Sequence, residues 1–412
     1  MLTPLYKETN FADVKRLYLL IGTACNMHCR HCIQTPVKEK ESKFNCKFTD
    51  KRVLNIVDHY VHFCVNDNLS KNRNPYIMFL WGGEPLLYWD FIKDLVVQLT
   101  EKHNILQNRN FRFKITTNGL LLDKDKINFI NKYQIITSFS YDAPWPFAVR
   151  DYISDDICEL VKQINRLEIQ TNHCAYNCDQ LLAYRCTRVK FPNAMVRVNS
   201  KLVRNFDMPA DIYNYDMEKV HTAIRKMRIG LQIGHPYSTR FLLNGLFLPL
   251  AIAKGRFLPN LGNERSLCIH LDGRIRDGFN AGSILANVEC PLEQIFTRIY
   301  EHKQALLGFA CKICRNKNIC RVPCFDMKDE AGNFVSCLPY HIKYFDYLKE
   351  ELAKTKYLAT KEDIDWYNEQ EKIDMKQVQI YLNEGKRYEK EHTRFPLEMM
   401  KKYLPKELER KL

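Results

Sequence analysis

Short apolar runs alternate with amphipathic stretches along the first half of the chain. The apolar runs have the length of buried strands and end at turn residues, whereas the stretches between them repeat their apolar positions at helical spacing. Six strands are therefore predicted, over residues 16–22, 76–83, 111–119, 134–142, 167–174 and 193–200. Helices are predicted over residues 48–67, 88–103, 122–133, 153–167 and 215–228, and Thr49 or Asp50 is expected to cap the first of them.

This alternation predicts the fold class. Strands that alternate with helices form parallel βαβ units with right-handed crossovers, and such units close into a whole or partial barrel. We therefore expect an α/β protein with a partial (β/α)6 barrel of the TIM type over residues 1–230. The alternation stops near residue 230, so a small, irregular, cysteine-rich domain is expected over residues 231–340 and a charged helical extension over residues 341–412. The extension is interpreted either as a helical cap on the barrel or as a tail that binds a partner.

The ends of the predicted strands carry the unusual polar residues of the sequence. Parallel barrels place their working side chains at the carboxyl ends of the strands. A run of three cysteines follows the first strand, and the segments WGGEP, TTNG and SYDAP follow the second, third and fourth. Gly82 and Gly83 would let a ligand approach the backbone closely, and the carboxylate of Glu84 could hold an ammonium group. These turns predict a binding site at one rim of the barrel.

The three cysteines stand in the segment CNMHCRHC, as Cys25, Cys29 and Cys32. Among the 16 cysteines of the chain this spacing could arise by chance, or it could form half of a zinc site. Zinc ligands usually come as C-x2-C pairs with a second pair downstream. Three thiols without a nearby fourth ligand suit a [4Fe-4S] cluster with one open iron, which can take an amine and a carboxylate from a small molecule. The fourth ligand is therefore predicted not to come from the protein.

With these motifs the sequence resembles the radical S-adenosylmethionine (radical SAM) enzymes, over roughly residues 16–228. In that family the C-x3-C-x2-C loop holds the cluster, and the open iron chelates the methionyl part of S-adenosylmethionine (SAM). A Gly-Gly-Glu-Pro motif of the family meets the amino group of the cofactor. Its counterpart here consists of Gly82, Gly83, Glu84 and Pro85. A local match around the SFSYDAP segment implies contacts to the ribose or carboxylate from Ser140, Asp142 and Arg150.

The resemblance also implies the chemistry. One electron reaches the sulfonium of SAM and a carbon–sulfur bond breaks, which leaves methionine and a 5'-deoxyadenosyl radical that abstracts a hydrogen atom from the substrate. The electron would come from an external one-electron donor of the flavodoxin or ferredoxin type. The protein would orient the cofactor and exclude water and wrong hydrogen donors.

A second cysteine cluster lies in the segment CKICRNKNICRVPC, which reads C-x2-C-x5-C-x3-C. Taken alone, it could be a zinc knuckle. Beside a radical SAM barrel it resembles the SPASM domain, whose members hold auxiliary [4Fe-4S] clusters and mostly modify peptides. The resemblance implies one auxiliary cluster with a complete ligand set, namely Cys311, Cys314, Cys320 and Cys337.

The other half of the SPASM pattern is incomplete, because Gly278 stands where the pattern has a cysteine. Cys324 would then be spare, a substitute for Cys337, or part of an irregular site with Cys268 and Cys290. At least one auxiliary cluster is expected, and ligand counting predicts about eight irons per chain. The remaining thiols are those of Cys46, Cys64, Cys158, Cys174, Cys178 and Cys186. Most of them are expected to be ordinary buried thiols, although Cys174 and Cys178 could face the barrel cavity.

Composition and charge limit the cellular context. The chain has 412 residues, of which 46% are hydrophobic, so a substantial core is expected. The sequence has no run of eighteen apolar residues, and its beginning lacks the apolar region of a signal peptide, so a cytoplasmic protein without a membrane partner is expected. The net charge of +14 suggests an acidic partner such as nucleic acid or an acidic peptide, or a solvated lysine-rich surface.

The sequence therefore predicts a radical SAM oxidoreductase that acts on a ribosomally made peptide or protein. The change could be a crosslink, a thioether, an epimerisation or an oxidation. Only 24 residues precede Cys25, so we expect no leader-binding domain there, and a separate protein could bind a leader. Alternatives are a sulfatase-maturation-type (formylglycine-generating) enzyme, a radical SAM enzyme that acts on nucleic acid, and a zinc-holding binding module. A metal assay that finds iron and sulfide rather than zinc would exclude the last.

Overall fold

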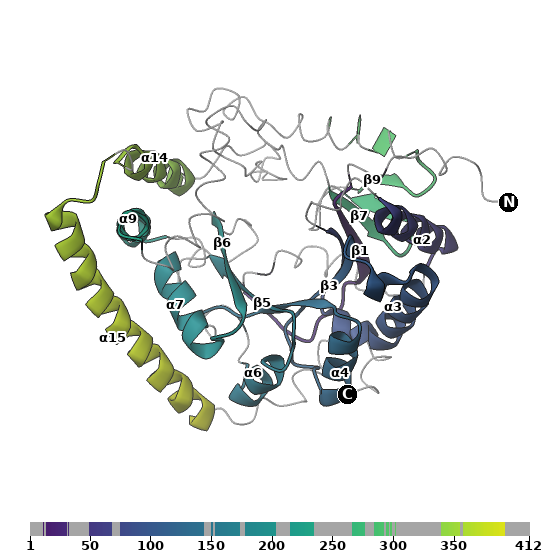
Figure 1. Cartoon of the computed structure of the whole chain (residues 1–412), viewed down its shortest axis with the longest axis horizontal. Coiled ribbons are helices and arrows are strands. Elements are labelled where there is room, and N and C mark those ends of the chain that lie inside the picture. Colours follow the sequence, from purple (N-terminus) through teal and green to yellow (C-terminus); the bar gives the residue numbers. More distant parts are fainter. Residues whose placement is uncertain are drawn as a thin grey trace, which may run out of the picture.

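The fold is a curved nine-stranded sheet with helices on its outer side (Figure 1). The strand order is β6-β5-β4-β3-β2-β1-β7-β8-β9, so the two edge strands are β6 and β9 and the sheet is not closed. The computed structural model describes residues 11, 14–30, 32, 49–67, 75–143, 150, 153–173, 178–202, 215–234, 266–276, 284–291, 294–295, 297–298, 301, 339–354 and 357–391. The predicted α/β class and partial barrel are confirmed.

Six parallel strands form the main part of the sheet, and each agrees with its predicted position to within two residues at either end. Their bounds are Arg16–Gly22 (β1), Tyr76–Gly82 (β2), Phe111–Thr117 (β3), Ile136–Ser140 (β4), Leu167–His173 (β5) and Met195–Leu202 (β6). The strands pair parallel in chain order from β1 to β6, as successive βαβ units require. Their carboxyl ends therefore lie at one rim of the barrel.

Helices connect these strands along the outer face of the sheet (Figure 1). Their bounds are Lys51–Asn66 (α2), Trp89–His103 (α3), Lys124–Lys132 (α4), Asp155–Val161 (α6), Gln180–Lys190 (α7) and Met217–Gln232 (α9), with short 3-10 turns at Pro85–Tyr88 (η5) and Ile105–Gln107 (η6). Asp50 caps α2 by accepting a hydrogen bond from the backbone N–H of Arg52, which confirms one of the two predicted caps.

The helix predicted over residues 153–167 is shorter in the structure, because α6 ends at Val161. The side chain of Asn131 explains the early end. Its Nδ2 donates to the carbonyl of Gln163 at 2.9 Å, and its Oδ1 accepts from the N–H of Asn165 at 2.8 Å. These bonds hold the chain in a turn that leads directly into β5.

Two parts of the architecture were not predicted. Helix α7 lies between β5 and β6, where no helix was expected. Beyond residue 230, three further strands continue the sheet past β1: Ser266–His270 (β7), Arg274–Arg276 (β8) and Ile284–Asn287 (β9). Strand β7 pairs parallel with β1, and β8 and β9 follow as antiparallel strands. The strand–helix alternation does stop near residue 230, but the sheet does not. The predicted domain boundaries stay a prediction.

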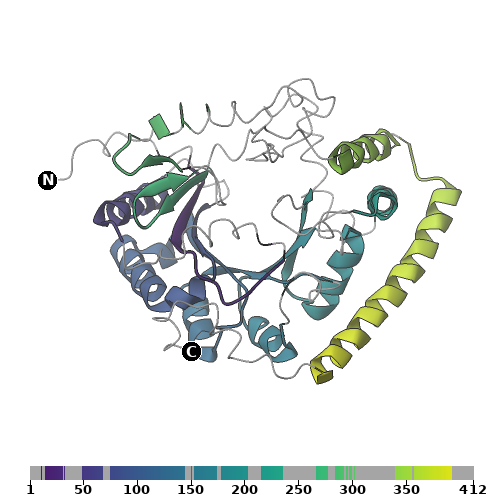
Figure 2. The same cartoon turned by 180° about the vertical axis from the view of Figure 1, so that it is seen from behind.

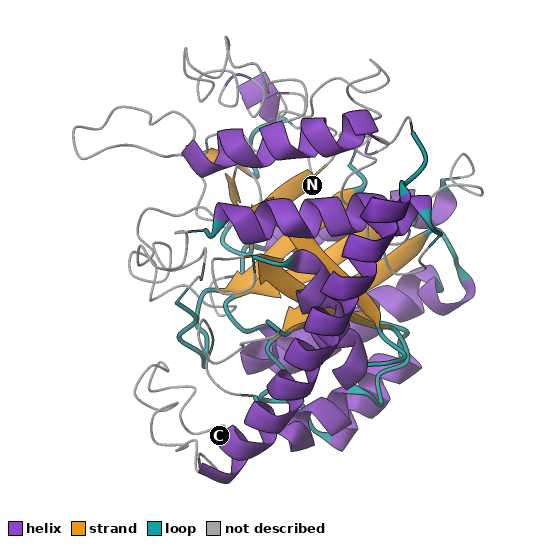
Figure 3. Ribbon diagram, turned by 90° about the vertical axis from the view of Figure 1, so that its left-hand side faces the viewer, coloured by secondary structure: helices purple, strands orange, loops and turns teal. Residues whose placement is uncertain are grey.

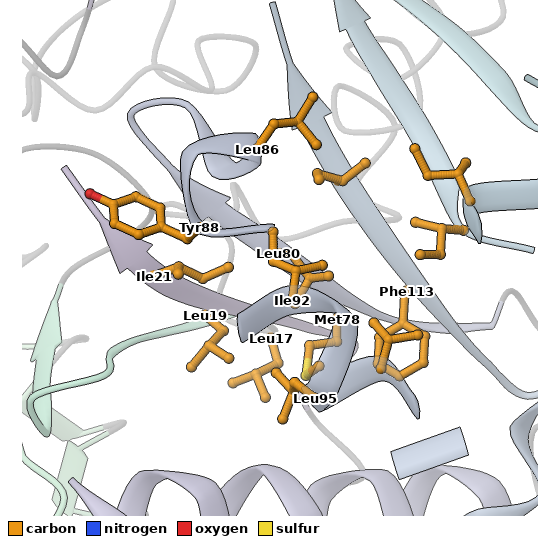
Figure 4. Close-up of a cluster of buried hydrophobic side chains, with 14 of the residues drawn as sticks. Leu17, Leu19, Ile21, Met78, Leu80, Leu86, Tyr88, Ile92, Leu95 and Phe113 are labelled. Carbon is orange, nitrogen blue, oxygen red and sulfur yellow. The ribbon is translucent and has the colours of Figure 1, made fainter. Parts of the chain in front are cut away.

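The core between the sheet and the outer helices follows from the period of two in the strands (Figure 4). Leu17, Leu19 and Ile21 of β1 point to the same side, and each is at most 1% exposed. Met78 and Leu80 of β2, Phe113 of β3, and Ile92 and Leu95 of α3 belong to the same cluster. Full burial of one such side chain contributes about 1.5–3 kcal/mol, so this cluster holds the strands that carry the site.

Two helices of the C-terminal segment pack outside α7 and α9, as seen in Figure 1 and from behind in Figure 2. They are Pro339–Lys354 (α14) and Lys361–Glu391 (α15), and Figure 3 shows α15 running obliquely across the side of the molecule. The predicted helical pattern is confirmed for the described residues up to Glu391, and these two helices cover the barrel. None of the helices in the described part of the chain is both long and apolar enough to cross a membrane.

Buried ion pairs attach α15 to the barrel. Lys226 of α9, only 1% exposed, lies 2.8 Å from a carboxylate oxygen of Asp374 and also pairs with Asp179. Arg185 of α7 pairs with the same Asp374 and with Glu371. Burial alone would lower the pKa of Lys226, because it disfavours the charged form. The carboxylates of Asp179 and Asp374 outweigh this effect, so the pKa of Lys226 is raised. The ammonium group is therefore charged when the helix is docked.

We expect Lys226→Met to destabilise the protein by about 3 kcal/mol, because it leaves buried carboxylates short of a cation. Hydrogen exchange should show α15 opening before the sheet. The control is Lys372→Met on α15, the helix that carries Asp374. Lys372 is 71% exposed and pairs with Glu369 at 3.1 Å, so its loss should change the free energy of unfolding by at most about 0.5 kcal/mol. Equal losses of stability in the two variants, measured by chemical denaturation, would contradict this account of the docking.

Candidate functional site

The three cysteines of the first motif lie directly after β1, at the carboxyl end of the strand. Cys25, Cys29 and Cys32 are half-buried thiols, and the N–H of Cys32 donates to the carbonyl of Cys29 at 3.1 Å. Burial raises the pKa of Cys29 to about 12; the guanidinium of Arg150 opposes this shift, and the thiols of Cys25 and Cys32 add to it. The thiols of Cys25 and Cys32 thus lie close enough to that of Cys29 to influence it electrostatically. A metal cation bound by them would favour the thiolate forms.

The two glycines at the end of β2, Gly82 and Gly83, pack against the cysteine loop. The N–H of Gly83 donates to the carbonyl of Gly22 at 3.0 Å, and the N–H of Glu84 donates to the carbonyl of Ala24 at 2.8 Å. A Cβ at Gly83 would lie 2.1 Å from the carbonyl oxygen of Ala24, and one at Gly82 would lie 2.3 Å from that of Gly22. The close neighbour that requires glycine here is the chain's own backbone. Contact between these glycines and a ligand stays a prediction.

Glu84 connects the ends of β2 and β3 through its side chain. The carboxylate is 1% exposed and accepts from the N–H of Leu86 at 3.0 Å, the hydroxyl of Thr117 at 2.7 Å and the N–H of Asn118 at 2.8 Å. Burial raises the pKa of Glu84 to about 7, although these three donors oppose the shift. Pro85 follows as the first residue of η5, where its fixed φ suits the turn. Glu84 thus fixes the end of β3 beside the end of β2.

Asn118 reaches the cysteine loop, and the sequence did not single it out. Its Nδ2 donates to the side-chain oxygen of Asn26 at 2.7 Å and lies 4.0 Å from Cys25 Sγ. Its own Oδ1 accepts from the N–H of Leu120 at 3.0 Å, which sets the orientation of the amide. The signal in the sequence was the TTNG turn at the end of the third strand. Only the parallel pairing of β1, β2 and β3 places that turn beside the cysteines.

Asp142 and Arg150 form a buried ion pair on the other side of the loop. Asp142 is 1% exposed and Arg150 is 8% exposed. Arg150 Nε donates to Asp142 Oδ2 at 2.9 Å, and its Nη1 lies 3.5 Å from Cys29 Sγ. Ser140, the last residue of β4, is half-buried two positions before Asp142. Two of the three residues matched around SFSYDAP therefore belong to one polar group that reaches the cysteine loop.

The other cysteines fall into two groups. Cys311, Cys314, Cys320, Cys324 and Cys337 lie outside the described residues, as do Cys46 and Cys174. Cys64, Cys158, Cys178 and Cys186 are buried, which confirms that expectation for these four.

The two cysteines considered for an irregular site lie in the strands and turns after residue 265. Cys268 of β7 is buried against the stacked rings of Tyr18 and Phe79, whose centroids are 4.3 Å apart. Cys290 follows β9 and is half-buried, with its sulfur 3.5 Å from Gln294 Oε1. Their grouping into a metal site with Cys324 stays a prediction.

Comparison with known proteins identifies the class of this site. Residues 19–178 match the family model of the Radical SAM superfamily, a stretch that contains the three cysteines, the Gly-Gly-Glu-Pro motif and the Asp142–Arg150 pair. This part of the chain is therefore similar to a radical SAM domain.

Individual relatives are more distant. The chain is 24% identical over 169 residues to the radical SAM cyclopropyl synthase TigE of Paramaledivibacter caminithermalis, and the match spans 40% of this chain but only 35% of TigE. It is 21% identical over 354 residues to an uncharacterized protein of Archaeoglobus fulgidus, which covers 80% of this chain and 78% of that protein.

Solved structures share the fold. Native anSMEcpe with bound AdoMet superposes with a TM-score of 0.58 at 16% identity, over 86% of this chain and 99% of that one. Native anSMEcpe with bound AdoMet and Cp18Cys peptide gives a TM-score of 0.56 at 17% identity over the same shares. These likenesses concern the architecture.

Proposed function

We propose that this protein is a radical SAM enzyme that modifies a ribosomally made peptide or protein. The observation that carries the proposal is the group of three half-buried thiols at the end of β1, inside the stretch that matches the Radical SAM superfamily. Cys25, Cys29 and Cys32 would each ligate one iron of a [4Fe-4S] cluster.

The residues present fit such a cluster. Three thiols on one loop supply three of the four positions, and thiolate is the usual protein ligand of these clusters. Asn118 and Arg150 place N–H groups near two of the sulfurs, as expected around ligands that carry negative charge. The fourth iron would take the amine and carboxylate of SAM.

When bound, the cluster and SAM would supply a 5'-deoxyadenosyl radical by one-electron cleavage of the sulfonium. The chain's own residues would hold and orient the cofactor. Gly82 and Gly83 keep the loop against β2, and Glu84 would accept a hydrogen bond from the ammonium group of SAM. Further contacts to the ribose or carboxylate are assigned to Ser140, Asp142 and Arg150, and Pro85 would fix the turn that carries Glu84.

We expect SAM binding to weaken as the pH falls below about 7. Burial raises the pKa of Glu84 to about 7 in the structure, so protonation below that pH removes the charge that would attract the ammonium group. Three protein donors occupy three of the roughly four acceptor positions of the carboxylate, which leaves one for a ligand. The dissociation constant should rise about tenfold per pH unit below the pKa.

Glu84→Gln tests this assignment. The variant keeps the size of the side chain and should bind SAM more weakly at pH 8, with little further change between pH 8 and pH 6. Equilibrium binding to the reconstituted protein measures both quantities. The assignment of Glu84 to the SAM site would be wrong if the dissociation constant of the wild-type protein did not change with pH and equalled that of the variant.

A peptide or protein substrate is supported by a solved structure of the same fold, that of anSMEcpe with a bound Cp18Cys peptide. The cysteine pattern of residues 311–337 supports the same substrate class, through its resemblance to SPASM domains. By that resemblance Cys311, Cys314, Cys320 and Cys337 would hold an auxiliary cluster, with Cys324 spare or a substitute ligand. The electron donor would be a flavodoxin or ferredoxin, and a separate protein would bind a leader.

The direct test combines metal, cofactor and substrate. Reconstituted protein should contain about eight irons per chain, form 5'-deoxyadenosine from SAM and dithionite, and change the mass of a short peptide encoded beside its gene. Cofactor cleavage with modification of nucleic acid instead of peptide would overturn the substrate assignment. About four irons would mean that the C-terminal cysteines hold no iron–sulfur cluster.

A further inference from the structure

We propose that Arg150 and Asn118 set the reduction potential of the cluster, by directing N–H groups at the sulfurs of Cys29 and Cys25. The inference rests on the proposed function, because it requires a cluster on the three cysteines. It assigns to these two residues a role distinct from contact with SAM. They would act on the cluster indirectly, through the sulfurs of its cysteine ligands.

Arg150 is held so that one edge of its guanidinium faces Cys29. Its Nε and Nη2 lie 2.9 and 2.8 Å from Asp142 Oδ2, and Nη1 lies 3.5 Å from Cys29 Sγ. Asp142 is fixed in turn, since its Oδ1 accepts from the N–H of Asn172 at 2.7 Å. The backbone N–H of Asn172 thus fixes Arg150 through Asp142, and the guanidinium of this ion pair directs one N–H edge at the Cys29 sulfur.

Asn118 approaches the loop from β3. Its amide is fixed by the N–H of Leu120 on the oxygen side, and its Nδ2 is directed at Asn26 and at Cys25 Sγ. The backbone N–H of Asn118 binds Glu84, which anchors the residue as a whole. The 4.0 Å separation from Cys25 is longer than that of Arg150 from Cys29, and the amide carries no net charge. Its effect should therefore be the smaller of the two.

Both contacts stabilise negative charge on the cysteine sulfurs. Reduction adds one electron to the cluster, delivered by a flavodoxin- or ferredoxin-type donor that is oxidised by one electron in the same step. The added charge is spread partly over the thiolate ligands, so N–H donors and a nearby cation stabilise the reduced form more than the oxidised form. Removal of either donor should make the potential more negative.

The test is a redox titration of the reconstituted protein, followed by electron paramagnetic resonance of the reduced cluster. A variant that lacks the auxiliary cluster ligands Cys311, Cys314, Cys320 and Cys337 isolates the signal of interest. On that background, Arg150→Met should lower the ratio of reduced to oxidised cluster at a fixed potential by about tenfold, which corresponds to about 59 mV for one electron. Asn118→Leu should shift the potential in the same direction by a smaller amount. The potential of Arg150→Lys should lie between that of Arg150→Met and that of the parent.

Arg225→Met is the matched control. Arg225 on α9 pairs with Asp363 of α15 at 3.0 Å and stacks on Trp366, so the substitution removes the same charge from an ion pair between these two helices. Its potential should equal that of the parent. A cubane signal with the same potential in the parent and in Arg150→Met would refute this inference and leave the proposed function intact. A parent that takes up no cubane cluster at Cys25, Cys29 and Cys32 would refute the proposed function itself.

Discussion

Replacement of Cys25, Cys29 and Cys32 together by alanine is expected to abolish 5'-deoxyadenosine formation from SAM under dithionite. A [4Fe-4S] cluster cannot be held by a loop that offers no thiolate, and without the cluster no electron reaches the sulfonium. The three side chains are half-buried, so their truncation should leave the fold intact. The iron bound elsewhere in the chain should remain, which separates loss of this cluster from loss of all metal.

Cys64→Ala provides the control for the loss of thiols in general. Cys64 is fully buried in α2, so this variant should lose about 1 kcal/mol of stability through the small cavity it creates. It should keep its activity, because Cys64 is not one of the proposed ligands. Liquid chromatography of 5'-deoxyadenosine and iron analysis of both variants decide the matter. Cofactor cleavage by the triple variant at the parent rate would show that another part of the chain holds the catalytic cluster.

Gly83→Ala is expected to cost about 3 kcal/mol of stability and to reduce cofactor cleavage by about a hundredfold. The new Cβ would lie 2.1 Å from the carbonyl oxygen of Ala24 and 2.4 Å from that of Thr23. Both atoms belong to the backbone, so the clash cannot be relieved by rotation of a side chain. The cysteine loop would have to move, and the hydrogen bond from Glu84 to Ala24 would be lost.

The matched control is Gly234→Ala at the end of α9. Its φ is +72°, but no atom lies within 4 Å of the position of the added Cβ. The substitution should cost about 1 kcal/mol through backbone strain alone and leave cluster content unchanged. Equal cluster contents and equal cleavage rates for the two variants would contradict the close packing of Gly83 on the cysteine loop.

Local patterns were sufficient for most of the elements. The six parallel strands have apolar runs whose alternate residues enter the core, and the helices between them have amphipathic spacing with acidic or hydroxyl caps such as Asp50 and Ser154. Helix α7 lacked this signal. Its buried residues include Gln180, Arg185 and Thr187, because α9 and α15 cover the side that would otherwise face water. A helix buried on several sides does not show a polar face.

Strand β7 was missed for a different reason. It is five residues long and lies more than two hundred residues after its partner β1, so only the folded sheet shows that it pairs there. The docking of α15 is likewise tertiary. Its sequence is rich in charge, as expected of a solvated helix, yet Asp374 is buried because Lys226 and Arg185 pair with it.

For the site, the sequence by itself predicted the three thiols as ligands and determined the rim on which they lie. The spacing of Cys25, Cys29 and Cys32 and the position of Gly82–Pro85 after a strand are local features, and parallel strands bring their carboxyl ends to one side. Tertiary structure decided the contacts. That Glu84 accepts hydrogen bonds from the end of β3, and that Asn118 and Arg150 reach the cysteine sulfurs, depends on strands far apart in the chain meeting in register, which no local pattern encodes.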